Sequence, residues 1–171
     1  MSACIRRGFL GLALAIWGAA SAWAERLPPP EGDVILTVRG NIAVKNLVDG
    51  TALDLDMIEA MGVETMHTGT IWTDGVREFQ GIELSRLLEQ LGAEGETLRL
   101  IALNDYAVEI PMTEAVDGGP MLAYRMDGII LSTRDKGPLW MIYPFDPKPE
   151  YKNEVSYSRS VWQLMVIEVL P

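Results

Sequence analysis

The sequence contains one histidine, His67, and one cysteine, Cys4, the two side-chain types most often used as bases, nucleophiles or metal ligands. Structural and catalytic zinc sites normally need several nitrogen or sulfur ligands, so this composition argues against a zinc site and we expect no metal ligands. No calcium loop, P-loop, dinucleotide fingerprint or G-x-S-x-G elbow occurs. A Ser-His-Asp triad through His67 stays open, although a lone histidine in a strand is more often structural. The catalytic residues therefore stay unknown at this level.

Cys4 lies in a segment that is typical of an export signal. Arg6 and Arg7 precede an apolar stretch at 8–20 and a small-x-small cleavage site at 22–24. The apolar stretch is short for a membrane span, and the arginine pair leaves either the general or the twin-arginine export route open. We predict a signal peptide at 1–24, a Pro-rich linker at 25–32 and one domain at 33–171, and hence a periplasmic or secreted protein. Cleavage would leave a mature chain without any thiol.

The charge of the chain limits its partners. The formal net charge is −10, and removal of the leader, which holds two arginines and no acid, would make it −12. Nucleic acids and anionic membrane surfaces select basic patches, so neither is an expected partner. We expect a small-molecule ligand or a periplasmic protein partner, and no membrane span after cleavage.

The pattern of the domain predicts an α+β fold. Helical spacing of apolar residues, each time followed by a glycine, predicts short helices at 53–61 and 85–91. Apolar and β-branched runs between Gly and Pro predict strands at 34–38, 63–72, 98–103, 106–110, 121–125, 128–131, 139–143 and 161–169. Short helices within a largely antiparallel set of strands indicate a single domain with a sheet or barrel-like core.

Five phrases in a fixed order cover most of this domain. They are FQGIELSRLL at 79–88, ALNDYAVEIP at 102–111, MLAYRMDG at 121–128, GPLWMIYP at 137–144 and SRSVWQL at 158–164. Together they resemble the oxidoreductase molybdopterin-binding family, which has the sulfite oxidase fold. The resemblance implies a mixed, strand-rich domain whose central pocket holds a molybdenum-bound pterin in the family's enzymes. The cofactor would supply the chemistry, while the protein binds and tunes it.

The chain departs from this family at the positions that would hold the cofactor. The resemblance places the metal-ligating cysteine of the family within 66–70, where the sequence reads MHTGT and offers no thiolate. Trp140 stands where the family's enzymes tend to carry arginine, and Trp162 roughly where they carry lysine. An indole N–H donates one hydrogen bond and carries no charge. Three cations lie close in sequence to these phrases and would have to replace the missing arginine and lysine at the pterin phosphate: Arg134, Lys136 and Arg159.

Three functions stay open at this point. The first is a cofactor-free binding protein that uses the old pocket for a small ligand or partner. The second is a molybdopterin-dependent oxidoreductase with a non-cysteine ligand such as His67. The third is an interaction subunit of a periplasmic sensor or redox complex, with an exposed loop at 146–154 as contact surface. We place the first before the others, expect no cofactor, and keep molybdopterin as the alternative. The predicted pocket residues are His67, Asn104, Tyr106, Arg134, Tyr143, Arg159 and Trp162.

Overall fold

The computed structural model describes residues 27–171, so the predicted signal peptide and the first two linker residues lie outside the described part. The strands are β1 (Leu36–Gly40), β2 (Gly50–Leu53), β3 (Glu64–Gly69), β4 (Val76–Glu83), β5 (Thr97–Ala102), β6 (Ala107–Pro111), β7 (Met121–Met126), β8 (Ile129–Ile130), β9 (Trp140–Ile142) and β10 (Leu164–Leu170). The helices are α1 (Leu55–Met61), α2 (Leu84–Gln90) and α3 (Glu154–Arg159), with 3₁₀ turns η1 (Met112–Glu114), η2 (Thr133–Asp135) and η3 (Pro149–Tyr151). In this part of the chain, none of the helices has the length and apolar character needed to cross a bilayer.

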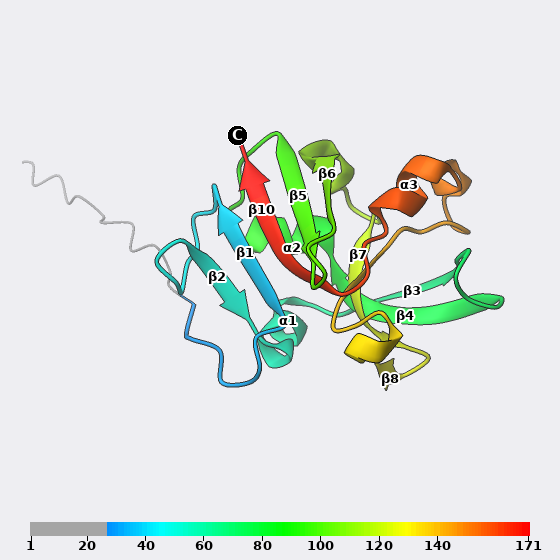
Figure 1. The fold of residues 1–171 in the computed structure, drawn as a ribbon, viewed down its shortest axis with the longest axis horizontal. Helices are drawn as coiled ribbons and strands as arrows, with labels where there is room; N and C mark the ends of the chain where they lie inside the picture. The colour runs from blue at the N-terminus through cyan, green and yellow to red at the C-terminus, as the bar shows by residue number, and fades with distance from the viewer. Residues whose placement is uncertain (1–26) are drawn as a thin grey trace, which may run out of the picture.

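The strands form two five-stranded sheets, as expected for an α+β domain (Figure 1). The first has the order β2-β1-β10-β5-β6, and β1 runs parallel to β10. The second has the order β3-β4-β7-β8, with β9 on β7, and all of its pairs are antiparallel. One parallel pair among antiparallel pairs makes the fold mixed, and the predicted fold class is confirmed.

Both predicted helices are present within two residues of their expected bounds. The side chain of Asp54 caps α1 by accepting a hydrogen bond from the Met57 N–H at 2.9 Å, and Gly62 ends the helix at φ +138°. The same carboxylate accepts the N–H groups of Glu31 and Gly32, at 2.8 and 2.9 Å. Asp54 therefore also fastens the described end of the predicted linker to the domain.

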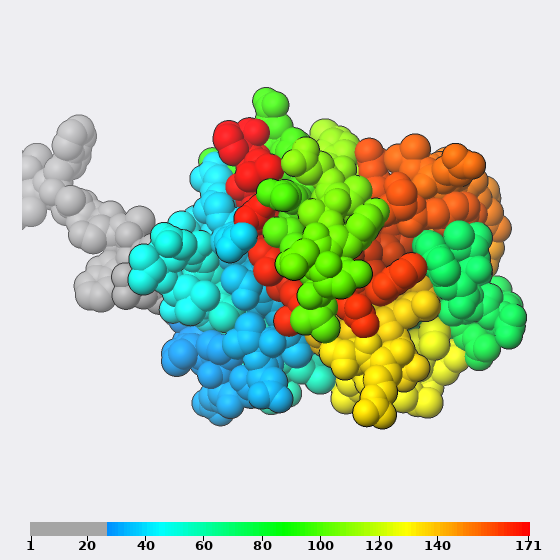
Figure 2. Space-filling view, in the orientation of Figure 1, coloured from blue at the N-terminus to red at the C-terminus, as the bar shows by residue number. Residues whose placement is uncertain are grey.

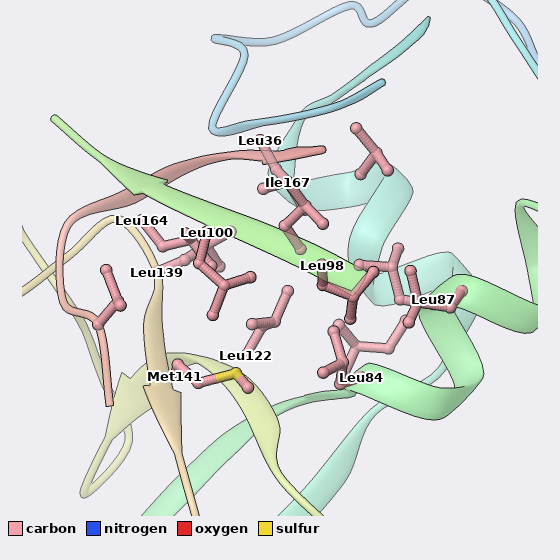
Figure 3. Close-up of a cluster of buried hydrophobic side chains, with 14 of the residues drawn as sticks. Leu36, Leu84, Leu87, Leu98, Leu100, Leu122, Leu139, Met141, Leu164 and Ile167 are labelled. Carbon is pink, nitrogen blue, oxygen red and sulfur yellow. The ribbon is translucent and has the colours of Figure 1, made fainter. Parts of the chain in front are cut away.

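Strands β7 and β9 are buried on both faces and separate two clusters. Leu122 and Met141 face a large cluster that also takes in residues of α1, α2 and the first sheet. Part of this aliphatic core is drawn in Figure 3: Leu36, Leu84, Leu87, Leu98, Leu100, Leu122, Leu139, Met141, Leu164 and Ile167. Alternate residues point the other way, into a cluster made by Phe79, Met121, Ala123, Leu131, Trp140 and Ile142. The site lies where the two clusters meet, because Ala102 and Val161 of its lining belong to the first cluster and Trp72 packs against the second.

Four elements differ from the sequence expectation. Strand β2 was not expected, because its four residues are all buried and show no alternation. Strand β4 was not expected, because its first three residues are exposed or half-buried and a register shift after Gln80 sends Phe79 and Ile82 into different clusters, so its apolar residues do not alternate. The loop predicted at 146–154 contains η3, and α3 begins at its last residue, Glu154. Helix α3 was not expected, because six residues capped by Asn153 are too few to show a helical period. Strand β10 begins at Leu164 rather than at 161, because Gln163 adopts φ +51° and interrupts the extended run.

Candidate functional site

A cavity of about 380 Å³ opens beside β5, α3 and the start of β10. Its lining comes from three segments that lie far apart in sequence: the turn between β3 and β4, the end of β5 with the following loop, and the end of α3 with the following turn. The lining residues are Trp72, Ala102, Asn104, Tyr106, Tyr157, Ser158, Ser160, Val161 and Trp162. Four of the nine are aromatic and none is charged. Aromatic walls with a few polar groups are typical of small-molecule sites.

Trp72 lies at the centre of the aromatic residues. Its ring meets those of Trp140, Tyr157 and Trp162 edge to face, with centroids 5.9, 6.0 and 5.7 Å apart. Trp140 is fully buried and in turn meets Phe79 at 5.6 Å. We call Trp72, Phe79, Trp140, Tyr157 and Trp162 the aromatic cluster. Edge-to-face pairs of this kind contribute about 0.5–1.5 kcal/mol each beyond the area that they bury.

The hairpin of β3 and β4 carries Trp72 to this place. The hairpin extends from the body of the molecule, and its turn lies beside α3 (Figures 1 and 2). At its base, the Gly69 N–H donates to the Asp146 carboxylate at 2.6 Å, and the Asp146 N–H donates to the Thr68 hydroxyl at 3.0 Å. The Lys152 ammonium donates to the same carboxylate at 2.6 Å. This lysine, followed by the Gly69 N–H, lowers the pKa of Asp146, so the carboxylate stays ionised and holds the hairpin.

A partly buried network fixes α3, the opposite wall. Glu114 accepts the hydroxyl of the fully buried Tyr143 at 2.5 Å and pairs with the guanidinium of Arg159 through its other oxygen. Burial, followed by the hydrogen bond to Glu114, raises the pKa of Tyr143 well above its ordinary value, so the hydroxyl stays a donor. Because Arg159 is the last residue of α3, the network ties that end of the helix to η1.

One cation lies against the cluster. The Lys136 ammonium is 4.7 Å from the ring centroid of Trp162 and 5.3 Å from that of Trp140. Its backbone carbonyl accepts the Gln163 N–H at 2.8 Å, which fixes the segment after η2 against the turn that carries Trp162. Within residues 27–171, no carboxylate forms an ion pair with Lys136. The lysine therefore interacts with indole faces rather than with an acid.

The structure brings together three of the seven predicted pocket residues. Asn104, Tyr106 and Trp162 line the cavity. Tyr143 and Arg159 lie behind its wall, in the Glu114 network, and Arg134 is exposed in η2. His67 projects from β3 with its side chain 64% exposed, and its Nε2 lies 3.4 Å from the Glu78 carboxylate. A ligand role for these four stays a prediction, and they are not lining residues of this cavity.

Sequence reasoning missed Trp72 and Tyr157. Trp72 was assigned to the end of a strand at 63–72, whereas it lies in the turn between β3 and β4. The run Thr73-Asp74-Gly75 that follows it is typical of a turn. A tryptophan next to a turn was therefore the signal in the sequence that could have indicated a site residue. Tyr157 had no such signal, because α3 has no apolar period.

The residues at this site do not fit a molybdenum-bound pterin held in the manner implied by the family resemblance. The one cysteine of the sequence, Cys4, lies outside the described residues, and 66–70 supply no sulfur but the thioether of Met66. Trp140, at the position of an expected arginine, is buried in the aromatic cluster, and the Arg159 guanidinium is already paired with Glu114. The described chain also contains no group of three or more His, Cys, Asp or Glu side chains placed to hold a metal ion.

One glycine in the phrase at 79–88 has a clear structural reason. A Cβ on Gly81 would lie 2.1 Å from the Leu122 carbonyl oxygen, so β4 and β7 approach too closely for any side chain. The register shifts at this point, between Gln80 and Gly81, as in a β-bulge. The phrase thus belongs to the fold rather than to the pocket.

Comparisons with known proteins agree with the fold. The structure is similar to the crystal structure of the sulfane dehydrogenase SoxCD from Paracoccus pantotrophus, with a TM-score of 0.59 and 17% sequence identity. The match covers 79% of this chain but only 37% of that chain, and at this identity it shows the fold alone. No curated protein sequence matches the chain. A family model described as the oxidoreductase molybdopterin binding domain matches residues 56–146, which is more than half of the chain. The chain therefore belongs to the oxidoreductase molybdopterin binding domain family.

Proposed function

We propose that this chain is an exported binding member of its family, which takes a small molecule in the aromatic cavity and carries out no conventional molybdenum catalysis. The observation that carries the proposal is the cavity lining. Segments that include the family phrases at 102–111 and 158–164 meet around about 380 Å³ of space, and four aromatic side chains line it without a thiolate or a free arginine. A pocket of this size and composition suits a small organic molecule.

The polar groups of the cavity support binding rather than catalysis. The Ser158 and Ser160 hydroxyls donate to backbone carbonyls of α3, those of Val155 and Ser156, at 2.7 and 2.9 Å. No histidine or carboxylate is among the lining residues, so neither hydroxyl has a base beside it. The hydroxyl and amide groups of the lining can orient a ligand by hydrogen bonds, which supports a binding role.

Metal analysis of the purified protein tests the absence of molybdenum chemistry. The full chain is expressed with its own leader in a host supplied with molybdate, and the purified protein is analysed by inductively coupled plasma mass spectrometry. We expect a molybdenum-to-protein ratio far below one. A ratio near one would overturn the proposal and favour a cofactor held by a ligand other than cysteine, such as His67. Intact-mass measurement of the same sample tests export, with a first residue of Glu25 as the expected result.

Ligand screening tests the cavity itself. Thermal shift of the purified protein against a library of small organic acids, amines and neutral compounds should yield at least one stabilising compound, because a ligand that binds only the native state raises its stability. The same compound should give no shift with Trp72→Ala. His67→Ala is the matched control, since His67 lies outside the cavity, and it should respond like the wild type. A compound that stabilises Trp72→Ala and the wild type equally would place its site elsewhere.

A further inference from the structure

We infer that the cavity selects a planar aromatic molecule with a carboxylate or similar acceptor oxygens, rather than an aromatic amine. This inference rests on the proposed function and names the class of its ligand. It combines three observations: the aromatic walls, the unused hydrogen-bond donors among the lining residues, and the sign of the charge beside the cavity.

The walls favour a flat ring. Trp72, Tyr106, Tyr157 and Trp162 supply four aromatic side chains to one cavity. Tyr106 and Trp162 are 48% and 39% exposed, so part of their apolar surface has no protein neighbour. A planar ring that enters the cavity removes this surface from water and also gains stacking or edge-to-face contacts. A saturated ring of similar size would obtain only the first of these contributions.

The lining keeps three N–H donor groups without a described acceptor, beside the hydroxyl oxygens of Tyr106, Ser158 and Ser160, which donate to backbone carbonyls and can still accept. Of the three tryptophans among residues 27–171, only Trp140 donates its indole N–H to an acceptor within these residues, the Ser160 carbonyl at 3.3 Å. Trp72 and Trp162 therefore each keep one N–H donor. Asn104 uses its side-chain oxygen to accept the Tyr106 N–H at 3.2 Å, which leaves its NH₂ group as a donor. Donors of this kind are complementary to the acceptor oxygens of a ligand.

The local charge favours an anion, although the chain as a whole is acidic. The formal net charge is −10, yet no carboxylate belongs to the lining. The nearest acid along the chain is the exposed Asp105, between two lining residues. The Lys136 ammonium lies on the face of Trp162, a wall of the cavity, and has no carboxylate partner among residues 27–171. Aromatic cages that bind organic cations rely on free ring faces, and here a protein cation already uses one.

A matched set of probes tests the inference on the full chain after export. Indole-3-acetate, tryptamine, cyclohexylacetate and acetate differ in charge, in aromatic character and in the presence of a ring. Titrations are followed by the indole N–H signals of Trp72, Trp140 and Trp162 in heteronuclear NMR spectra, assigned with single Trp→Phe variants. We expect indole-3-acetate to shift the Trp72 and Trp162 signals with a Kd about tenfold lower than that of tryptamine. The Lys136 ammonium attracts the anionic acetate and repels the cationic amine.

Charge variants identify the cause of the selectivity. Lys136→Asn should reduce the preference for indole-3-acetate over tryptamine to about threefold or less, because the cation is gone. Asparagine tolerates the left-handed conformation of this residue, at φ +74°, so the backbone is preserved. Asp105→Asn, also at a left-handed position with φ +63°, should strengthen indole-3-acetate binding about twofold. Lys45→Asn removes the same charge from a separate surface hollow and should leave the preference unchanged.

The outcomes separate the two proposals. Equal or tighter binding of tryptamine would overturn the inference of an anionic ligand while the cavity remained a binding site. Equal binding of cyclohexylacetate would overturn the aromatic class in the same way. If no ring probe shifts either indole signal, the inference fails, and the library screen with its Trp72→Ala control then decides whether the cavity binds any small molecule. A stoichiometric molybdenum content would overturn the proposed function itself.

Discussion

Strands β7 and β9 separate the aliphatic core from Phe79 and Trp140 of the aromatic cluster, and these two parts of the molecule are closed in different ways. The aliphatic core is covered by the first sheet and by α1 and α2, and its members are fully or nearly fully buried. The aromatic cluster is buried only at Trp140 and Phe79, whereas Trp72, Tyr157 and Trp162 reach the cavity. Regular elements close the first, whereas the ends of β5 and α3 and the turns and loops beside them border the second. The first is therefore suited to stability and the second to binding.

The largest expected loss of stability comes from the aliphatic core. Leu100 is fully buried in β5, and Leu100→Ala should lower the free energy of unfolding by about 2–5 kcal/mol, through lost transfer energy and the cavity left behind. Urea unfolding followed by circular dichroism measures this change. Binding of a cavity ligand to the folded fraction should stay unchanged. A loss below about 1 kcal/mol would contradict the description of this core as tightly packed.

Removal of a member of the aromatic cluster should impair ligand binding more than stability. Trp72→Ala should lower the free energy of unfolding by about 2 kcal/mol, less than for a fully buried tryptophan, because the side chain is only partly buried. Ligand binding in the cavity should be lost. Urea unfolding and NMR titration with indole-3-acetate measure the two effects. Trp72→Phe is the control, and it should recover part of both. Binding that survives Trp72→Ala would separate the cluster from the site.

The network behind the cavity wall should have an intermediate effect. Glu114→Gln removes the charge that pairs with Arg159 and weakens the acceptor for the Tyr143 hydroxyl. We expect a loss of about 1–2 kcal/mol in the free energy of unfolding, as for other partly buried charge-assisted hydrogen bonds. Hydrogen exchange should become faster in α3 than in α1, because only α3 is tied to Glu114. Equal acceleration in both helices would indicate a global effect instead.

The carboxyl of Asp54, which caps α1 beside the aliphatic core, should make the stability of the protein depend on pH. Backbone N–H groups, first that of Gly32 and then that of Met57, lower the pKa of this carboxyl below its ordinary value of 3.8. A carboxyl with a lowered pKa in the native state stabilises the fold above its ordinary pKa, and this contribution is lost as the pH falls through the native pKa.

Thermal unfolding tests this pH dependence. The melting temperature of Asp54→Asn should be lower than that of the wild type by a constant amount between about pH 5 and 7. The difference should shrink below pH 3.8, the ordinary pKa of the carboxyl. A difference that persists unchanged at lower pH would assign the effect to geometry rather than charge.

The smallest effect is expected at His67. Its side chain is exposed and its contact with Glu78 is a surface pair, so His67→Ala should change the free energy of unfolding by no more than about 0.5 kcal/mol. Ligand binding in the cavity should not change. Urea unfolding and the probe titrations give both values. A loss of binding on this substitution would identify His67 as a ligand-binding residue and would contradict the assignment of the binding site to the cavity.

Much of the fold could be predicted from the sequence, and less of the site. Apolar periodicity and terminal glycines indicated α1 and α2 within two residues, because their signals are local. Strands β2 and β4 and helix α3 were missed, since none of them has a complete apolar period. Asn104, Tyr106 and Trp162 were predicted from the family phrases that contain them, and they line the cavity. Trp72 was missed because a turn residue has no period that shows where its side chain packs.

The sequence by itself determined the α+β class, the membership in a molybdopterin-binding family and the absence of any cysteine from residues 27–171. Residue types and their order suffice for these statements. Only the tertiary structure decided that β9 is buried on both faces, so that Trp140 belongs to a packed cluster while Trp162 remains at a cavity. Period-two alternation separates the faces of a strand but cannot show what covers each face. That depends on contacts between segments distant in sequence, which here place Trp72 beside α3.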